Sequence, residues 1–475
     1  MIYAAVGSDG NTHVYGLDLT DTSAPPIPTQ ITNLSVPSSE HICYGGQVES
    51  DLTTPNSLAV VMYVTPGQAG AKPGTVGYCG WGTGTFELAH YTDSPTVAPV
   101  TLNIPGGTTL LSALQNDIGF TPLYQTSGAL GGIVLWDAST GNLDFYSDAT
   151  FTSSSTLLSN VSAPVACVNA NAIANGNLSA GGRLLANVTT ASGTTAYQIT
   201  AAGGAPEQFF AGDASSCVAD SKNLYFIGTP SGGTASAIYQ EPLAATPPAQ
   251  QLFTLPTITS TEGSSLIGSN GSLLFFENYS ESSGSVTSSI FSVPEGVAST
   301  SATAVGSPYS GNLESTFLAS PTGNAANDLL FVTALDETSS GVNYSSQLLS
   351  SSALVGNFPD TVLGTFGPLS PELDGNILEI DGVTDTNGGY GGGTINALEL
   401  ESLTPAPLTT TGGSAYTVPS GYVISLNGFY GTNIATGFML SVATPTAPYI
   451  GVALDLSHQV ILPLNLTNSS VQALF

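Results

Sequence analysis

The chain of 475 residues contains 33 aspartates and glutamates but only three lysines and arginines, so its formal net charge at pH 7 is −30. Charged residues make up 8% of the sequence, against roughly 25% in an average soluble domain, and the surface must therefore be mostly uncharged and polar. Phosphate groups and anionic membranes are bound through clustered basic side chains, so this composition excludes a nucleic-acid partner and disfavours an anionic membrane surface.

Short apolar runs alternate with turns rich in glycine, proline and serine along the whole chain. The 55 glycines and 30 prolines interrupt any long helical period, and no stretch shows the apolar spacing of an amphipathic helix. The 19 tyrosines and 18 phenylalanines are spread over the full length, which argues against disorder. We therefore predict an all-β protein and, because the composition barely shifts, a single domain over residues 1–475.

Nine apolar strands, called anchors here, each start a new unit. In chain order the anchors are MIYAAVG (1–7), SLAVVMYV (57–64), GGIVLWD (131–137), RLLANVT (183–189), NLYFIG (223–228), SLLFFEN (272–278), DLLFVTA (328–334), NILEIDG (376–382) and YVISLNG (422–428). A second and often a third strand follow each anchor. Segments of small residues precede several of them: HICYGGQV (41–48), APVACVNA (163–170), ASSCVADS (214–221), GSSLIGSN (263–270) and STFLASPT (315–322).

A period of roughly 40–60 residues with three or four strands per unit is typical of a β-propeller. Small residues suit the inner strand of each blade, because the blades converge around the central axis. Nine anchors exceed the usual ~4–8 blades, and the first unit lacks an inner strand of its own. We predict eight blades, with seven or nine as alternatives, and a ring closed by the N- and C-terminal strands. A β-helix and tandem β-sandwiches are the rival folds.

The segment SKNLYFIGTPSGGTASAIYQEPL (221–243) resembles the repeats of the TolB-like and YWTD-like β-propeller superfamily. In those repeats a polar residue precedes an aliphatic and aromatic strand, a turn, and a second strand that ends in proline or leucine. The resemblance extends over about residues 160–410, although no YWTD tetrapeptide is present. It implies a propeller with mostly binding roles, and it transfers no functional residue.

The cysteines are Cys43, Cys79, Cys167 and Cys217, and none has the spacing of a zinc site. Their even number predicts up to two disulfides, with Cys43–Cys79 inside one repeat and Cys167–Cys217 at equivalent positions of adjacent repeats. Four buried thiols are the alternative. No run of about 18–20 apolar residues predicts a transmembrane segment. We expect an extracellular or cell-envelope protein whose leader is not present in this sequence.

One segment has the oxygen ligands of a weak Ca²⁺ site, namely Asp381, Asp385 and Asn387. It lacks the D-x-D-x-D-G pattern, so a polar hairpin turn is the alternative. No other cofactor is predicted.

Three aromatic residues are weak candidates for ligand binding. Tyr390 lies in the glycine-rich segment 388–393, where it could be an exposed contact, and Trp81 and Trp136 could stack on a sugar ring. A core or blade-interface position is the alternative for both tryptophans.

No catalytic residue is predicted. The histidines His13, His41, His90 and His458 lie near acidic residues, but no G-x-S-x-G motif supplies a nucleophile beside them.

The leading hypothesis is a non-catalytic, secreted or cell-envelope propeller that binds a protein or glycan at the cell surface through loops on one ring face. The alternative is a carbohydrate-active hydrolase or lyase that uses carboxylates at the channel mouth. Self-assembly into a surface structure is a third possibility.

Overall fold

A computed structural model defines the fold of this chain. It describes residues 2–6, 11–16, 29–30, 41–50, 58–65, 85–91, 100–102, 118–124, 130–137, 140–147, 154–162, 164–167, 183–200, 205–219, 222–242, 249–256, 262–282, 285–318, 329–338, 341–349, 354–359, 361–364, 376–381, 384–385, 390–391, 393–399, 404–410, 412–430, 434–441, 450–455, 459–464 and 471–474, with side chains for part of them. Within these ranges all the regular elements are strands, and no helix capable of crossing a membrane occurs there.

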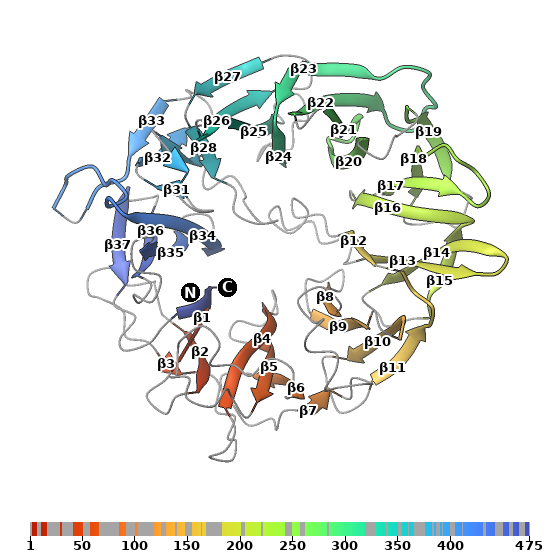
Figure 1. Ribbon diagram of the computed structural model, residues 1–475, viewed down its shortest axis with the longest axis horizontal. Coiled ribbons are helices and arrows are strands. Elements are labelled where there is room, and N and C mark those ends of the chain that lie inside the picture. Colours follow the sequence, from red (N-terminus) through yellow and green to blue (C-terminus); the bar gives the residue numbers. More distant parts are fainter. Residues whose placement is uncertain are drawn as a thin grey trace.

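The strands form antiparallel sheets that follow one another around a common axis, which gives an all-β propeller (Figure 1). We number the sheets 1 to 9 in chain order and give the strands of each sheet in the order in which they pair, which in sheets 1 to 8 begins with the strand nearest the axis. Sheets 1 to 3 contain β38 (Val471–Leu474), β1 (Ile2–Val6), β2 (Thr12–Gly16) and β3 (Thr29–Gln30); β4 (His41–Ser50), β5 (Leu58–Thr65), β6 (Thr85–Tyr91) and β7 (Val100–Leu102); and β8 (Ile118–Tyr124), β9 (Leu130–Asp137), β10 (Asn142–Ser147) and β11 (Ser154–Leu158).

The next three sheets have the same four-stranded order. They contain β12 (Val165–Cys167), β13 (Arg183–Thr190), β14 (Gly193–Thr200) and β15 (Glu207–Phe210); β16 (Gly212–Ala219), β17 (Asn223–Pro230), β18 (Ala237–Pro242) and β19 (Gln250–Thr254); and β20 (Glu262–Ser269), β21 (Leu273–Ser282), β22 (Ser285–Pro294) and β23 (Thr303–Ser310).

The last three sheets include one exchange of strands. They contain β24 (Asn312–Leu318), β25 (Leu329–Thr338), β26 (Gly341–Leu349) and β27 (Leu354–Pro359); β28 (Thr361–Gly364), β29 (Asn376–Asp381), β32 (Thr394–Glu399) and β33 (Thr404–Pro407); and β30 (Thr384–Asp385), β31 (Tyr390–Gly391), β34 (Tyr422–Tyr430), β35 (Ile434–Ser441), β36 (Ile450–Asp455) and β37 (Val460–Leu464). The short hairpin β30–β31 arises between β29 and β32 of sheet 8 but pairs with β34 of sheet 9.

Hydrogen bonding groups the described strands into nine sheets, whereas the sequence pattern favours eight blades and leaves nine as an alternative. Each anchor lies in a different sheet, and the small-residue segments before the anchors form inner strands such as β4, β16 and β20. The count rises because the first and last units do not merge. The C-terminal strand β38 pairs with β1, while β34 has its own sheet, in which it pairs with β31 on one side and with β35 on the other.

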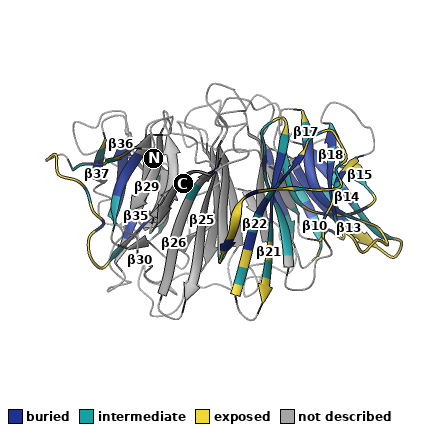
Figure 2. Ribbon diagram, turned by 90° about the horizontal axis from the view of Figure 1, so that it is seen from above, coloured by how far each residue is buried: buried dark blue, intermediate teal, exposed yellow. Residues whose placement is uncertain are grey.

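Each sheet with a neighbour on either side has both of its faces buried. This explains why the anchors are continuous apolar runs and not runs in which apolar and polar residues alternate. In β21, Phe276 packs toward sheet 5 against Tyr225 and Ile238. Its neighbour Phe275 packs the opposite way, toward Leu349 of sheet 7. Figure 2 shows this burial along the middle of the strands and exposed residues at the far ends of β21 and β22.

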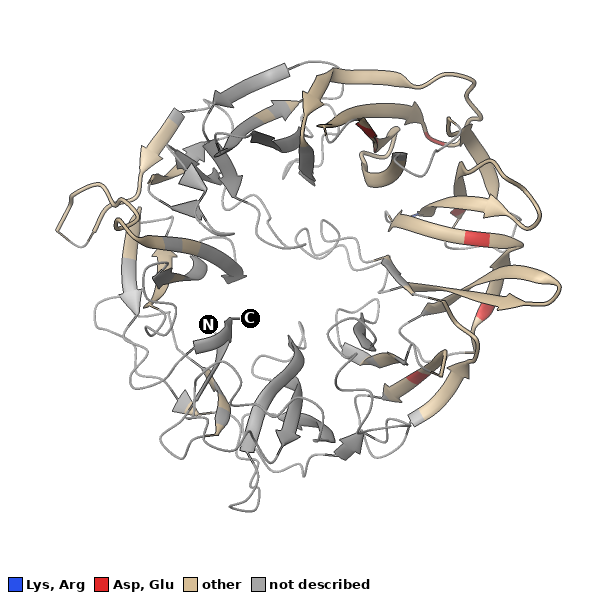
Figure 3. Cartoon of the chain, viewed as in Figure 1, with Lys and Arg blue, Asp and Glu red and all other residues tan. Residues whose placement is uncertain are grey.

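Acidic residues are sparse where the side chains are described. They are spread over several sheets (Figure 3), with Asp213 and Glu241 both on sheet 5 and Glu277 and Glu281 both on β21. Among the described residues, no group of three or more His, Cys, Asp or Glu side chains is placed to hold a metal ion.

Candidate functional site

The turns of the propeller divide into two ring faces because neighbouring strands are antiparallel. The connection between the second and third strands lies on the same edge of a sheet as the connection onward to the next sheet. We call this edge the hairpin face and define it by Ala191–Ser192, Ala211, Ser231–Ser236, the ends of β21 and β22 at Ser282 and Ser285, and Gly311. Two backbone hydrogen bonds link neighbouring segments at this face. Ser231 N donates to Ala211 O at 2.9 Å, and Gly311 N donates to Val286 O at 2.8 Å.

The hairpin face is exposed and carries little charge. Pro230 to Ala235 are all exposed, and so are Glu281, Ser282 and Ser285 at the tip of sheet 6. Apart from Glu281, these residues are small or uncharged. Such a surface can form hydrogen bonds with a ligand through hydroxyl groups and backbone amides, without a strong electrostatic field.

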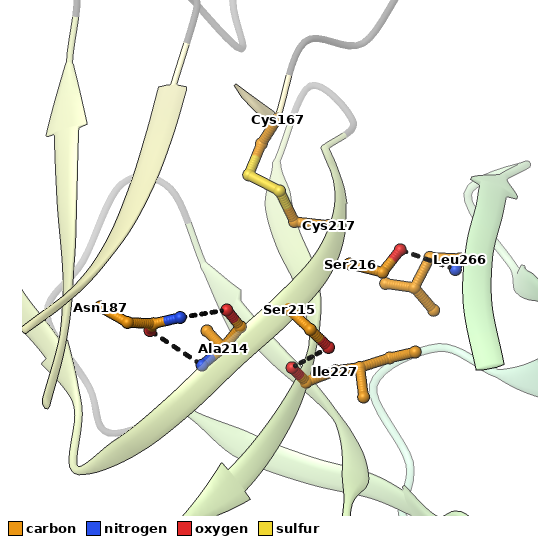
Figure 4. The surroundings of a disulfide bond; sticks show 8 residues. All are labelled: Cys167, Asn187, Ala214, Ser215, Ser216, Cys217, Ile227 and Leu266. Atoms are coloured by element: carbon orange, nitrogen blue, oxygen red, sulfur yellow. Dashed lines mark hydrogen bonds between the residues drawn. A yellow bond between two sulfur atoms is a disulfide. The ribbon is translucent and has the colours of Figure 1, made fainter. Parts of the chain in front are cut away.

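A disulfide joins the inner strands of two adjacent sheets, and its Cys167 lies opposite Arg183, at the end of β13 that is away from the hairpin face. Cys167 of β12 and Cys217 of β16 are bonded, with their Cα atoms 5.3 Å apart and a sequence separation of 50 (Figure 4). This bond is one of the two pairings that the sequence predicts. Cys43 lies in β4, but its side chain and the whole of Cys79 lie outside the described residues, so their pairing stays a prediction.

A buried amide reinforces the same junction. Asn187 of β13 is 5% exposed; its Nδ2 donates to Ala214 O at 2.7 Å, and its Oδ1 accepts from Ala214 N at 3.0 Å (Figure 4). One side chain therefore satisfies both backbone groups of Ala214, where β16 has a β-bulge between Ala214 and Cys217. On the other side, Leu266 N of sheet 6 donates to Ser216 Oγ at 2.9 Å.

Hydrogen bonds between uncharged groups also join further pairs of sheets. Gly296 N donates to Gln240 Oε1 at 2.7 Å between sheets 6 and 5, and Tyr309 Oη donates to Gln347 Oε1 at 2.8 Å between sheets 6 and 7. Thr409 N donates to Gln459 O at 2.8 Å where sheet 8 meets sheet 9. These contacts hold the sheets together with groups that do not titrate near neutral pH.

Glu277 is a buried carboxyl on the face of β21 that is turned toward sheet 7. It is 8% exposed and lies between Ser265 of β20 and Ile290 of β22 in the sheet register. Burial raises the pKa of Glu277 above its ordinary 4.5, and hydrogen bonds from the Ser288 and Ser265 hydroxyls oppose that rise.

Tyr279 lies two residues beyond Glu277 on the same strand and therefore on the same face of the sheet. It is paired with Gly263 of β20 and with Ser288 of β22, and its side chain is 44% exposed. A Cβ atom at Gly263 would lie 2.3 Å from the Cζ and Oη atoms of the tyrosine. The ring thus rests on the bare backbone of the inner strand, at the hairpin face.

Trp136 belongs to the interface between sheets 3 and 4. It is half-buried, packs against a cluster that includes Leu143 and Leu184, and donates its indole N–H to Val161 O at 3.3 Å. This matches the blade-interface alternative, and its sugar-stacking role stays a prediction. Trp81 lies outside the described residues.

The predicted Ca²⁺ segment runs between two sheets. Asp381 ends β29 of sheet 8, while Asp385 of β30 pairs with Tyr390 of β31 in sheet 9. Tyr390 pairs in turn with Ile424 of β34, so its backbone belongs to a sheet and not to a free hairpin tip. The side chains of Asp381, Asp385 and Tyr390 and the whole of Asn387 are not among the described residues. The Ca²⁺ site and the ligand-binding role of Tyr390 therefore stay predictions.

Of the histidines, His13 of β2 is buried, and its ring lies edge-on to Tyr15. The side chains of His41 and His90 and the whole of His458 are not among the described residues.

The sequence patterns missed Asn187, Glu277 and Tyr279. A signal was present for each of them, because each is a polar or exposed residue inside or directly after an apolar anchor. Only the packing of neighbouring sheets reveals which of these residues are buried.

Comparison with known proteins shows likeness in structure alone. No family model matches the chain, and no curated protein matches it. A crystal structure of the eukaryotic initiation factor is similar over 99% of this chain and 96% of that one, with 9% identity and a TM-score of 0.51. TolB from Acinetobacter baumannii covers 91% of this chain and 81% of its own at 13% identity and a TM-score of 0.25.

Prolyl oligopeptidase B from Galerina marginata, bound to a 25mer macrocyclization substrate, also matches. The match covers 76% of this chain and 52% of that one, at 8% identity and a TM-score of 0.37. At such identities a likeness shows a fold and not a function. The structure, together with the likeness to the initiation factor, therefore shows an all-β, propeller-type protein.

Proposed function

We propose that this chain is a non-catalytic propeller of the extracellular space or cell envelope, which binds a protein or glycan through its hairpin face. The observation that carries the proposal is an exposed set of uncharged turns, among them Ser231–Ala235, on sheets joined by a disulfide and by hydrogen bonds between uncharged groups. Loops on a rigid scaffold are the usual place for binding residues. The disulfide supports an oxidising compartment, because such bonds are rare in the cytosol.

The test compares the two ring faces with one matched pair of variants. Thr234→Arg changes the hairpin face, and Ser272→Arg changes an exposed turn between the first and second strands of sheet 6, on the opposite face. Each variant adds the same charge and bulk. Purified protein is screened against glycans and cell-surface proteins, and the affinity of any ligand found is then measured for both variants.

Thr234→Arg is expected to weaken binding at least severalfold, while Ser272→Arg leaves it unchanged. The reverse pattern would move the site to the other face and overturn the proposal. Blank screens together with turnover of any substrate would overturn it as well.

Carbohydrate hydrolysis is a second candidate function, and Glu277 is the observation that favours it. A carboxyl whose pKa is raised by burial can act as a general acid. Glu277→Gln removes the proton donor while keeping its shape, so an enzyme would lose its release of reducing ends, whereas a binding protein would keep its affinity.

A further inference from the structure

Tyr279 is an unusual residue for this surface. Among the side chains that the structure describes, the large apolar ones that are exposed are Tyr279, at 44%, and Val297, at 62%. Val297 lies in the connection from β22 to β23, on the face opposite the hairpin face. Among the described residues of the hairpin face, Tyr279 is therefore the one with an exposed aromatic ring.

The position of the ring is built into the sheet. The neighbours of Tyr279 in the register are Gly263 and Ser288, both small. Because a Cβ atom at Gly263 would lie 2.3 Å from the ring, any side chain there would displace it. Glycine thus lets the tyrosine lie against the inner strand, with its outer surface open to solvent.

The surroundings of the ring define the chemistry of a ligand. Glu277 and Glu281 lie on the same face of β21, two residues before and after Tyr279, which places them about 7 Å away on each side along the strand. Glu281 is exposed, so its carboxylate can accept hydrogen bonds from ligand hydroxyls. With so few lysines and arginines in the whole chain, an anionic ligand would meet negative charge without compensation.

The apolar area at this site is that of one ring. Stable protein interfaces bury about 800 Å² on each partner around a core rich in aromatic residues, and no second large apolar side chain is exposed beside Tyr279 among the described residues. One face of a sugar ring is apolar and of matching size, and its C–H groups meet the negative face of an aromatic ring favourably. These features favour a glycan over a protein.

We propose that Tyr279, resting on Gly263, is a stacking platform for a neutral sugar residue, and that Glu281 accepts hydrogen bonds from its hydroxyl groups. This inference rests on the proposed function and specifies its glycan form. It predicts selectivity as well, because uronic acids and sulfated sugars would be repelled by Glu281.

Isothermal titration calorimetry with neutral, uronic-acid and sulfated oligosaccharides tests the site, using the full chain and four variants. Tyr279→Ala is expected to weaken binding of a neutral glycan by about tenfold or more, the loss that corresponds to about 1.4 kcal/mol. Tyr279→Trp should keep the affinity, because the platform remains. Gly263→Ala should weaken binding, because the new methyl group displaces the ring. Val297→Ala is the matched control for an exposed apolar residue and should leave binding unchanged.

If a glycan binds but Tyr279→Ala binds it as well as the wild type, the platform is wrong while the proposed function stands. If no neutral glycan binds, or if the anionic sugars bind better, the inference is also wrong. If no neutral glycan binds, the proposed function is still tested by comparing Thr234→Arg with Ser272→Arg for their affinity toward a protein ligand. Circular dichroism of each variant shows that a lost affinity is not a lost fold.

Discussion

Removing the disulfide between the inner strands of sheets 4 and 5 should destabilise the protein strongly. The variant is Cys167→Ala/Cys217→Ala, which leaves Cys43 and Cys79 in place and so differs from treatment with a reducing agent. Cys167 is 1% exposed and lies in a core cluster with Leu185 and Ala214. Alanine at both positions removes only the sulfur atoms and keeps the packing of the backbone.

The magnitude follows from the length of chain that the bond closes. A cross-link between residues 50 apart in sequence removes about 14 cal/mol/K of entropy from the unfolded chain, which amounts to about 4 kcal/mol at 25 °C in the chain-entropy model. The buried sulfur atoms add a smaller packing term. We therefore expect the free energy of unfolding to fall by about 4 kcal/mol.

Equilibrium urea unfolding, followed by fluorescence and circular dichroism together, measures this change, and hydrogen exchange at β12 and β16 locates it. Ser215→Ala is the control, since Ser215 is close to the bond but contributes one hydrogen bond to Ile227 O at 3.3 Å, worth about 1 kcal/mol. An unchanged unfolding midpoint in the double variant, or equal losses in the double variant and the control, would refute the entropic argument.

Four further outcomes are expected. Asn187→Ala leaves the buried N–H and C=O of Ala214 without their amide partner, which should lower the free energy of unfolding by about 2–5 kcal/mol. A decrease below about 1 kcal/mol, measured by urea unfolding, would contradict the stabilising role of these two hydrogen bonds. Burial holds the pKa of Glu277 above 4.5 in the folded state, so this group's contribution to stability is present at lower pH and is lost as the pH rises through that raised pKa. Unfolding midpoints in Glu277→Gln should lack this dependence, and identical pH profiles would disprove the assignment. Burial likewise raises the pKa of Tyr309 to about 12 from 10.0, so its contribution is complete below pH 10 and disappears toward pH 12; a spectrophotometric titration of Tyr309→Phe against the wild type identifies the late-ionising phenol. Finally, three lysines and arginines and four histidines give little positive repulsion in acid, so far-UV circular dichroism should persist at about pH 3, and cooperative unfolding near pH 4 would contradict this.

The sequence pattern was most informative where a signal is local and repeated. The run LLFF in β21 is apolar on both sides because both faces of its sheet are covered, by Tyr225 on one side and Leu349 on the other. Small residues before the anchors indicated inner strands such as β16, because the sheets converge there. The pairing of Cys167 with Cys217 followed from their equivalent positions in neighbouring repeats.

The number of sheets was harder to predict, because it depends on pairing between distant segments. The strands β30 and β31 have two residues each, and the glycine-rich sequence around Tyr390 is typical of a turn. No local pattern shows that such a segment pairs with Ile424 and so joins the next sheet.

The site residues were missed for a related reason. In sequence, Tyr279 continues the aromatic run of β21 and is typical of core. Its exposure arises because β21 extends beyond the packed part of the sheet, and because Gly263 opposite it has no side chain. Only the register between the two strands brings these residues together.

The pairing of β38 with β1 has a consequence for biosynthesis. The hairpin formed by β1 and β2 leaves the ribosome before the other described strands, yet its partner β38 is translated after all of them. Until then the edge of β1 is open to pairing with any other extended chain. A chaperone that holds this early segment, or export ahead of folding, would protect it, and a nascent chain stopped before Val471 would keep that edge exposed.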